Sequence, residues 1–564
     1  MTAEHVGNKP HRPVDPVDEA SVARWWRDLV TQRPEAVALR TLDGEIGLAE
    51  LDRRSANLAH ALLVSGHGKG SRIALLMGNG PDWIVAWIAT QRIGALCIFL
   101  SSFFAESELR HALRHSDAQL LLLEPTYLHH DYAARLEAAF PDLEASEGAP
   151  LLVADAPYLR AVWSTRPSAR RWVEAGFAQA ESRGAAVARK APELLARVEA
   201  EVVSTDLSLI IYTSGSTAHP KAVVHRQGVV ADKIRFLADN DSIIPAATAP
   251  GDCVLVTMPL FWVGGLLSCF GALDRGAIVA FSPALPAHEL WPLIRRFEAT
   301  HVTGGDAVLR SLQDHLGPER SLADHLKPQN SNQMAWFRAR DGHDPQSIGA
   351  GFGMTETLGP HSGFHSLADT FGVLRGSVGR ALPGVERRIL DPGAGAALAP
   401  GEAGELAVKG RWLMQGYYKQ PHSQCFDEDG FFRTGDRCRI DERDMLHFIG
   451  RDGGMLKTSG ANVAPEEVEV ALRECDDVIE AVVVGVPDAR RGQLVAAIVA
   501  LRPGSAQDEA GLRAGLQAKL SSFKIPRRFR FMPFDEMPRT ASNKIDRRAL
   551  ARLMSAPGSA EPCA

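Results

Sequence analysis

The chain has 564 residues, which is too long for a single hydrophobic core, so two or more domains are expected. A hydrophobic content of 45% and a charged content of 23% are those of an ordinary soluble globular protein. The formal net charge of −6 argues against a general nucleic-acid binder, which would usually be basic.

The seven cysteines are scattered and form no Cys-x-x-Cys pair, which favours a reducing compartment over a disulfide framework or a zinc site. The first fourteen residues are polar and contain Pro10 and Pro13, unlike a signal peptide. The longest apolar run, residues 83–100, is interrupted by Gln91 and Arg92. It indicates a core helix followed by a strand, not a membrane span. We therefore expect a cytoplasmic protein.

The first half of the chain has the pattern of an α/β protein. Residues 1–20 are expected to form a loose arm. Over residues 22–123, helical segments alternate with short apolar runs at 72–77 and 120–123, which predicts βα units and a parallel sheet. Residues 125–200 are rich in Ala and Arg and are expected to be helical.

A loop rich in hydroxyl groups, residues 212–221, follows an apolar run at 207–211 that predicts a buried strand. Hydroxyl and backbone N–H donors, a glycine that permits close approach and a lysine charge together suit a polyphosphate. A Walker A loop is excluded because Pro220 stands where that motif needs Gly; a plain surface turn is the alternative. The candidate phosphate-binding residues are Thr213, Ser214, Gly215, Ser216, Thr217 and Lys221.

A second candidate motif, residues 351–357, reads Gly-Phe-Gly-Met-Thr-Glu-Thr. Phe352 can lie flat against adenine and Thr355 can donate to a phosphate. Glu356 is a hard oxygen ligand that suits Mg²⁺. The alternative is a helix N-terminus with a capping Thr and a Glu in its first turn.

The last part of the chain predicts a β-rich subdomain and then a small α+β domain. Short strands separated by Gly, Pro and Asp turns fill residues 376–451, and the carboxylate of Asp436 can accept two hydrogen bonds from a ribose diol. Beyond it, an amphipathic helix at 465–475 and apolar strands at 478–486 and 494–501 indicate a domain of ordinary size.

Five motifs in order, residues 212–221, 351–357, 432–436, 450–460 and 538–547, resemble those of the adenylate-forming superfamily. That superfamily includes acyl-coenzyme A synthetases, peptide-synthetase adenylation domains and luciferases. Two family glycines of the first loop are replaced by Ala218 and Ala222, which leaves the donor groups in place. A third is replaced by Asn543, and Asn tolerates a left-handed backbone.

The resemblance covers about residues 48–550 and implies three parts. These are a loose arm at 1–20, an adenylating domain of parallel βα sheets with a β-rich subdomain at 21–452, and a small mobile α+β domain at 453–564. The turn at 259–265 would lie beside the acid, with Trp262 in the pocket, although a plain core position suits Trp262 too. Residues 301–348 match the family poorly.

The resemblance also implies a role for each candidate residue. The catalytic residues would be Lys544, Lys221, Thr355 and Glu356, with Lys544 against the carboxylate and α-phosphate and Glu356 holding Mg²⁺. The nucleotide would contact Gly351, Phe352, Gly353, Met354, Thr355, Asp436 and Arg451, and the acyl pocket would contain Phe261, Trp262 and Gly264. Gly453 would be the hinge of a domain rotation that exchanges Lys544 for the coenzyme A side, Lys457, Ser459 and Gly460.

The implied activity is an ATP-dependent acyl-coenzyme A ligase with ATP, Mg²⁺ and coenzyme A as cofactors and co-substrates. Abundant small and apolar residues at 259–269 favour a hydrophobic acid, and fatty, alicyclic, steroid-derived and aryl acids all fit. No Gly-x-Ser-x-Gly elbow is present, which argues against a serine hydrolase. Two alternatives stay open: an adenylation enzyme that loads a separate carrier protein, and an inactive nucleotide-binding homologue. A homodimer is also compatible with the sequence.

Overall fold

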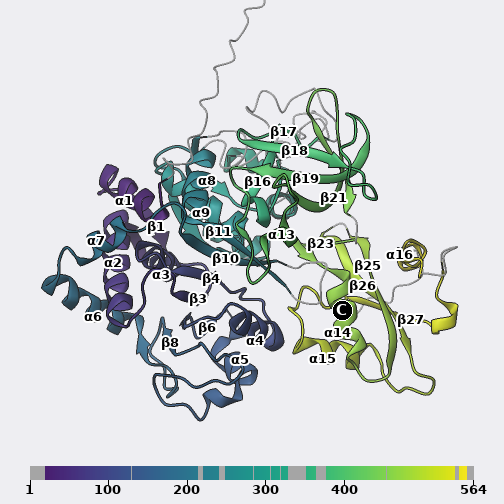
Figure 1. The fold of residues 1–564 in the computed structure, drawn as a ribbon, viewed down its shortest axis with the longest axis horizontal. Helices are drawn as coiled ribbons and strands as arrows, with labels where there is room; N and C mark the ends of the chain where they lie inside the picture. Colours follow the sequence, from purple (N-terminus) through teal and green to yellow (C-terminus); the bar gives the residue numbers. More distant parts are fainter. Residues whose placement is uncertain are drawn as a thin grey trace, which may run out of the picture.

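The computed structural model describes residues 20–128, 130–213, 220–239, 248–283, 285–304, 306–317, 319–327, 351–363, 377–451, 454–488, 490–539 and 545–555. Figure 1 shows a large α/β body, a β-rich part beside it and a smaller α+β domain at the end of the chain.

The larger sheet has the strand order β20–β11–β10–β4–β3–β5–β8–β9. Its central strands pair in parallel, as the alternation of helices and strands predicted. They are apolar runs buried on both faces, which is typical of parallel sheets. The strands are β3 (Arg72–Leu76), β4 (Leu96–Phe99), β5 (Leu120–Leu123), β8 (Ala161–Ser164), β9 (Ala175–Gly176), β10 (Leu207–Thr213), β11 (Lys221–Arg226) and β20 (Gly416–Tyr417).

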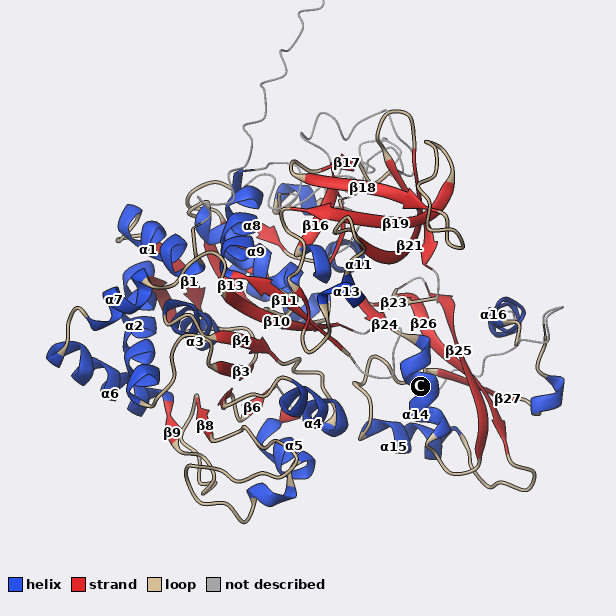
Figure 2. Cartoon of the chain, viewed as in Figure 1, coloured by secondary structure: helices blue, strands red, loops and turns tan. Residues whose placement is uncertain are grey.

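A second sheet of the large body has the order β14–β12–β13–β1–β2. Its strands are β1 (Val37–Thr41), β2 (Gly44–Gly47), β12 (Cys253–Val256), β13 (Ile278–Phe281) and β14 (His301–Val302), and a small ribbon is formed by β6 (Thr126–Tyr127) and β7 (His130–Asp131). Helices cover both sheets (Figure 2). They are α1 (Val22–Gln32), α2 (Leu48–Val64), α3 (Pro81–Arg92), α4 (Glu106–His115), α5 (Tyr132–Ala139), η2 (Pro141–Leu143), α6 (Phe177–Lys190), α7 (Leu194–Ala200), α8 (Gln227–Asp239), α9 (Val263–Asp274), α10 (Ala287–Arg296), α11 (Asp306–Leu316) and η3 (Leu322–Asp324).

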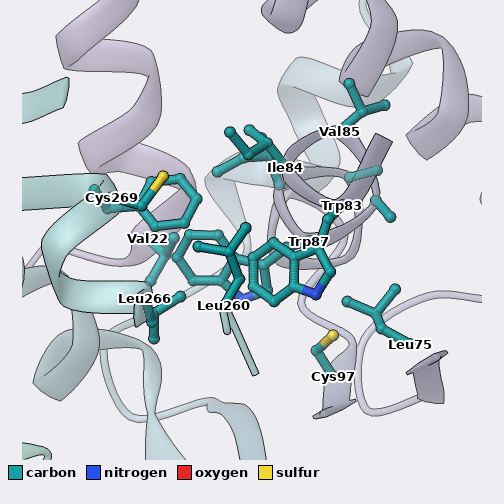
Figure 3. Packing of buried hydrophobic residues seen from close by; sticks show 14 of the residues in the cluster. Val22, Leu75, Trp83, Ile84, Val85, Trp87, Cys97, Leu260, Leu266 and Cys269 are labelled. Atoms are coloured by element: carbon teal, nitrogen blue, oxygen red, sulfur yellow. The ribbon is translucent and has the colours of Figure 1, made fainter. Parts of the chain in front are cut away.

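The main core lies between the two sheets and is filled by α3 and α9. Both helices are buried around most of their circumference, as expected for helices that are apolar on all sides. Trp83 and Trp87 of α3 lie together among Leu260 and the sheet residues Leu75 and Cys97 (Figure 3). The run at 83–100 is therefore a core helix followed by β4, as predicted.

The β-rich subdomain contains two antiparallel sheets, β15–β16–β17 and β18–β19–β21–β22. Its elements are β15 (Phe352–Met354), η5 (Thr355–Thr357), β16 (Gly359–Gly363), β17 (Arg380–Ala381), β18 (Val385–Leu390), β19 (Ala403–Gly410), α13 (His422–Cys425), β21 (Phe432–Ile440) and β22 (Leu446–Arg451).

The small domain is a sheet of order β24–β23–β26–β25, with β27 parallel to β26. One face packs against α14 and α15, and the other face packs against α16. Its elements are β23 (Leu456–Thr458), β24 (Ala461–Val463), α14 (Pro465–Arg473), β25 (Val478–Asp488), β26 (Gly492–Leu501), α15 (Glu509–Gln517), β27 (Arg528–Phe531), η7 (Phe534–Glu536) and α16 (Arg547–Ser555).

The predicted fold class is confirmed, with one local correction. Residues 125–200 were expected to be helical, but they contain β8 and β9 as well as helices, because β8 adds a parallel strand beside β5. Most of the loose arm, residues 1–19, lies outside the described residues, and its boundary stays a prediction. Within the described part of the chain, no helix is both long and apolar enough to cross a membrane.

Candidate active site

The hydroxyl-rich loop is bracketed by the two strands that pair at the edge of the larger sheet. Thr213 at the end of β10 lies opposite Lys221 at the start of β11. The carboxyl ends of parallel strands are where α/β sheets place ligands. The intervening candidates, Ser214, Gly215, Ser216 and Thr217, lie outside the described residues.

Lys221 and Glu356, which are 135 positions apart by number, meet at one tyrosine. The Lys221 Nζ atom lies 4.9 Å from the centroid of the Tyr417 ring, and the Tyr417 hydroxyl donates to the Glu356 Oε1 atom at 2.8 Å. Tyr417 reaches this position because β20 pairs with β11. Sequence analysis did not identify Tyr417, because its role comes from strand pairing and not from a spacing within a motif.

The Thr355–Glu356 motif is held in a 3₁₀ turn, η5, which is neither an extended loop nor the start of an α-helix. The backbone amide of Met414 donates to the Glu356 carbonyl at 2.8 Å, and the His225 Nε2 atom lies 2.8 Å from the Thr355 carbonyl. Because a carbonyl only accepts, His225 donates from Nε2. Burial lowers the pKa of His225 to about 4, so this histidine is neutral and serves as a fixed donor.

Gly353 is fixed by the close approach of β15 and β16. A Cβ atom at position 353 would lie 2.0 Å from the Gly359 carbonyl oxygen, which is backbone and cannot move aside cheaply. Gly351 is exposed at the start of this segment, and Met354 is partly buried. The pairing therefore fixes the backbone on both sides of Phe352.

The candidate adenine residue Phe352 and the candidate ribose residues Asp436 and Arg451 are linked through strand β22, although Phe352 lies in a different sheet. The Phe352 ring centroid is 5.3 Å from that of Phe448 on β22, and β22 pairs with β21 so that Arg451 lies opposite Asp436. The Asp436 amide donates to the Thr434 hydroxyl at 3.1 Å. Asp436 is buried, while the side chain of Arg451 lies outside the described residues.

The candidate acyl side is an aromatic cluster formed by Phe103, Phe261 and Trp262. The Phe103 centroid lies 5.8 Å from that of Phe261 and 5.9 Å from that of Trp262. Phe261 is buried and Trp262 is half-buried. At Gly264, the second residue of α9, an added Cβ atom would lie 3.3 Å from the Met258 sulfur. Phe103 was missed by sequence analysis because it follows β4, far from the other two in the chain.

The turn that carries the aromatic cluster is pinned by Asn79. Its side-chain amide donates to the Met258 carbonyl at 2.8 Å, and its side-chain oxygen accepts from the Leu260 amide at 2.8 Å. Both hydrogen bonds join the segment after β3 to the segment after β12, so they hold the turn that carries Phe261 and Trp262 against the larger sheet.

The candidate coenzyme A residues lie on the hairpin of β23 and β24. Lys457 is exposed, and its backbone amide donates to the Gln493 side chain at 2.9 Å. Ser459 and Gly460 form the turn with positive φ angles of 50° and 85°. Gly453 and Lys544 lie outside the described residues.

The donor set fits Mg²⁺ bound together with a nucleotide. Among the described residues, no group of three or more His, Cys, Asp or Glu side chains could hold a metal ion by itself. Mg²⁺ is usually held by one or two carboxylates, and substrate phosphates and water complete its octahedron. The single carboxylate of Glu356, oriented by Tyr417 near the end of the hydroxyl-rich loop, meets that requirement.

Two family models match the chain. The AMP-binding enzyme model matches residues 26–418, and the model of the AMP-binding enzyme C-terminal domain matches residues 467–544. The second match falls within the small domain, and the first covers both sheets of the large body.

Curated relatives match almost the whole chain. The indoleacetate–CoA ligase of Aromatoleum aromaticum is 30% identical over 527 residues, covering 93% of this chain and 96% of that protein. The 2-succinylbenzoate–CoA ligase of Geobacillus kaustophilus is 28% identical over 540 residues, covering 95% and 98%.

Solved structures show the same architecture. The amide bond synthetase McbA from Marinactinospora thermotolerans has a TM-score of 0.75 at 26% identity, covering 95% of this chain and 100% of that chain. The o-succinylbenzoate CoA synthetase of Bacillus subtilis has a TM-score of 0.70 at 22% identity, covering 94% and 98%, which supports the fold alone.

Proposed function

The chain belongs to the family of AMP-binding enzymes and is an acid–thiol ligase of that family, and on this premise we propose its substrate and the roles of its residues. The enzyme activates a hydrophobic carboxylic acid with ATP and transfers the acyl group to coenzyme A. The observation that carries the proposal is the meeting of Lys221 and Glu356 at Tyr417, at the end of the hydroxyl-rich loop.

The reaction has two steps. A carboxylate resists attack because it is anionic, so its oxygen first attacks the α-phosphorus of ATP, and the bond to pyrophosphate breaks. In the second step a thiol sulfur attacks the acyl carbon, loses its proton and displaces AMP. No side-chain nucleophile is required, and catalysis comes from positioning and charge stabilisation.

The large domain binds the triphosphate. Lys221, the hydroxyls of Thr213, Ser214, Ser216 and Thr217, and the Gly215 backbone hold the β- and γ-phosphates. Glu356 would hold Mg²⁺, which would neutralise phosphate charge, and Tyr417 keeps the Glu356 carboxylate in place. Phe352 lies against adenine between Gly351 and Gly353, with Met354 and Thr355 beside the phosphates. Asp436 and Arg451 contact the ribose.

The small domain serves the two steps in turn. Lys544 contacts the carboxylate and α-phosphate during adenylation. Rotation about Gly453 then replaces it with the hairpin that carries Lys457, Ser459 and Gly460. Glycine suits such a hinge because it reaches φ/ψ regions closed to other residues.

The acid is proposed to contain a ring. Phe103, Phe261 and Trp262 present aromatic surfaces beside the pinned turn, and such surfaces pack well against flat or ring-shaped groups. The relatives named above act on indoleacetate and 2-succinylbenzoate, which both contain rings. Acids that contain a ring are therefore favoured over straight-chain fatty acids, and aryl acids are proposed first because indoleacetate and 2-succinylbenzoate are both aryl acids.

A panel of acids tests the proposal directly. Pyrophosphate release and thioester formation would be measured for aryl, alicyclic, steroid-derived and straight-chain acids, with free coenzyme A or a carrier protein as acceptor. We expect the largest kcat/KM for an aryl acid with coenzyme A. Faster transfer to the carrier protein would favour the alternative acceptor, and no pyrophosphate release with any acid would contradict the proposal.

A further inference from the structure

A loop of the small domain docks onto the large domain. This docking loop, residues 518–524 between α15 and β27, lies against the first turn of α4. The Ser107 amide donates to the Ala518 carbonyl at 3.3 Å, and the Ser107 hydroxyl donates to the Lys519 carbonyl at 2.8 Å. The Ser521 hydroxyl donates to Glu108 Oε2 at 2.7 Å.

Lys524 fixes the docking loop with charge. Its ammonium donates to Glu108 of α4 at 2.5 Å and to Glu467 of α14 at 2.7 Å, and each of the three side chains is only 4% exposed. Burial opposes the charge of Lys524, but the two carboxylates raise the pKa of its ammonium above the ordinary value. A buried ammonium is stable only with such partners, so the docked state depends on both domains.

Docking places an aromatic ring of the small domain on the aromatic cluster. The Phe523 centroid lies 5.8 Å from that of Phe103 in an edge-to-face arrangement, and Phe103 in turn contacts both Phe261 and Trp262. Phe523 is the residue next to Lys524, so the ion pairs and the ring contact form or break together.

In the docked orientation, one face of the small-domain sheet lies toward the large domain and the other face lies away from it. Glu467 belongs to α14, so the α14 side of the small sheet faces the large domain. Arg539 and Ile545, which flank the segment containing Lys544, pair with each other, and Ile545 packs with α16 on the other face. Figure 1 shows α16 on the side of the small domain away from the large domain.

We propose that Phe523 is a specificity-determining residue that joins the acyl site only while the small domain is docked through Lys524. This inference rests on the proposed function, since it takes the aromatic cluster as the acyl side. The acid is then selected twice: once by the large domain during adenylation, and again when Phe523 closes over the aromatic cluster for transfer to the thiol.

The first test separates the two half-reactions of Phe523→Ala. Adenylation would be followed by pyrophosphate release, and transfer by single-turnover thioester formation from preformed acyl adenylates of a ring acid and a straight-chain acid. We expect adenylation within about twofold of wild type, and a ring-to-chain transfer ratio that falls about 10-fold, the scale of a lost apolar contact. Phe531→Ala, an exposed ring on β27 of the same domain, is the matched control and should leave that ratio unchanged.

The second test measures docking without turnover. Glu108→Gln removes the charge that the large domain contributes, while Glu467 still pairs with Lys524 inside the small domain. We expect faster hydrogen exchange in peptides covering residues 103–108 and 518–524, and a ring-to-chain transfer ratio that falls as in Phe523→Ala.

The outcomes distinguish the two proposals. An unchanged transfer ratio in Phe523→Ala, or an equal change in both half-reactions, would overturn the role of Phe523. Unchanged exchange in Glu108→Gln would overturn the docking by Lys524. If the wild-type enzyme made no thioester from any acid, the proposed function would fail instead, whatever the exchange experiment shows.

Discussion

Tyr417 connects the candidate phosphate residue Lys221 and the candidate Mg²⁺ residue Glu356 through opposite parts of one side chain. Its ring lies under the Lys221 ammonium, and its hydroxyl donates to Glu356. Neither contact could be inferred from the sequence, because nothing in the position of Gly-Tyr-Tyr at 416–418 links it to the motifs that contain Lys221 and Glu356. His225 was missed for the same reason: its contact with Thr355 exists only because β11 lies beside η5.

Tyr417→Phe should weaken adenylation while keeping the ring below Lys221. Losing a hydrogen bond to a charged group costs about 1.5–3 kcal/mol, which corresponds to roughly 10- to 100-fold in rate. Pyrophosphate release measured against Mg²⁺ concentration should show both a lower rate and a higher Mg²⁺ requirement. Tyr418→Phe is the control, because the Tyr418 hydroxyl donates to Asp117 instead. Similar losses in both variants would remove Tyr417 from the site.

Buried neutral histidines make stability depend on pH. Burial lowers the pKa of His225 to about 4 and that of His361 to about 3, against 6.5 in the unfolded chain. Between the folded pKa of each histidine and 6.5, the unfolded chain therefore binds more protons than the folded chain. The stability that the neutral histidines contribute is fully present above about pH 6.5. It is lost as pH falls from there through about 4 for His225 and about 3 for His361. The melting temperature should fall over this range, and His225→Gln should flatten the slope. A slope unchanged by His225→Gln would contradict this assignment.

At the scale of elements, runs that are apolar throughout were predictable and short mixed runs were not. β5 matches the predicted strand at 120–123, because four consecutive leucines suit only a buried position. β8 was missed within residues predicted as helical, because Ala161–Ser164 is recognisable as a strand only through its pairing with β5. The motif at 351–357 was identified from its residues, but its 3₁₀ turn depends on the neighbouring strand β16.

The pairing of β15 with β16 leads to a prediction for Gly353→Ala. The new Cβ would overlap the Gly359 carbonyl, so the strands must separate and shift Phe352 and Glu356. Overpacking of this kind costs about 1–3 kcal/mol, and we expect a lower melting temperature together with at least a 10-fold loss of pyrophosphate release. Gly271→Ala in α9 is the control, because no atom beyond its chain neighbours and the nearby backbone of its own helix lies within 4 Å of its added Cβ. Its stability should be equal or higher.

At the scale of the whole molecule, the two half-reactions are expected to depend on different parts of the small domain. Lys544→Ala should lower acyl-adenylate formation by about 10²–10³-fold, the scale of one lost electrostatic donor, and should spare thioester formation from a preformed adenylate. Lys457→Ala should show the reverse. Single-turnover assays of each step would measure both effects, and equal losses in the two steps would contradict the division of roles.

The docking loop also bears on how interchangeable the parts of this enzyme are. Lys524 satisfies one carboxylate from each domain, so neither half carries a complete set of partners. A small domain transplanted from another ligase would seat on this large domain only if it brought a cation to Glu108 and a ring to Phe103. Chimeras of this enzyme should therefore be joined so that the first turn of α4 and residues 518–524 are inherited together, although some 400 positions separate them in the chain.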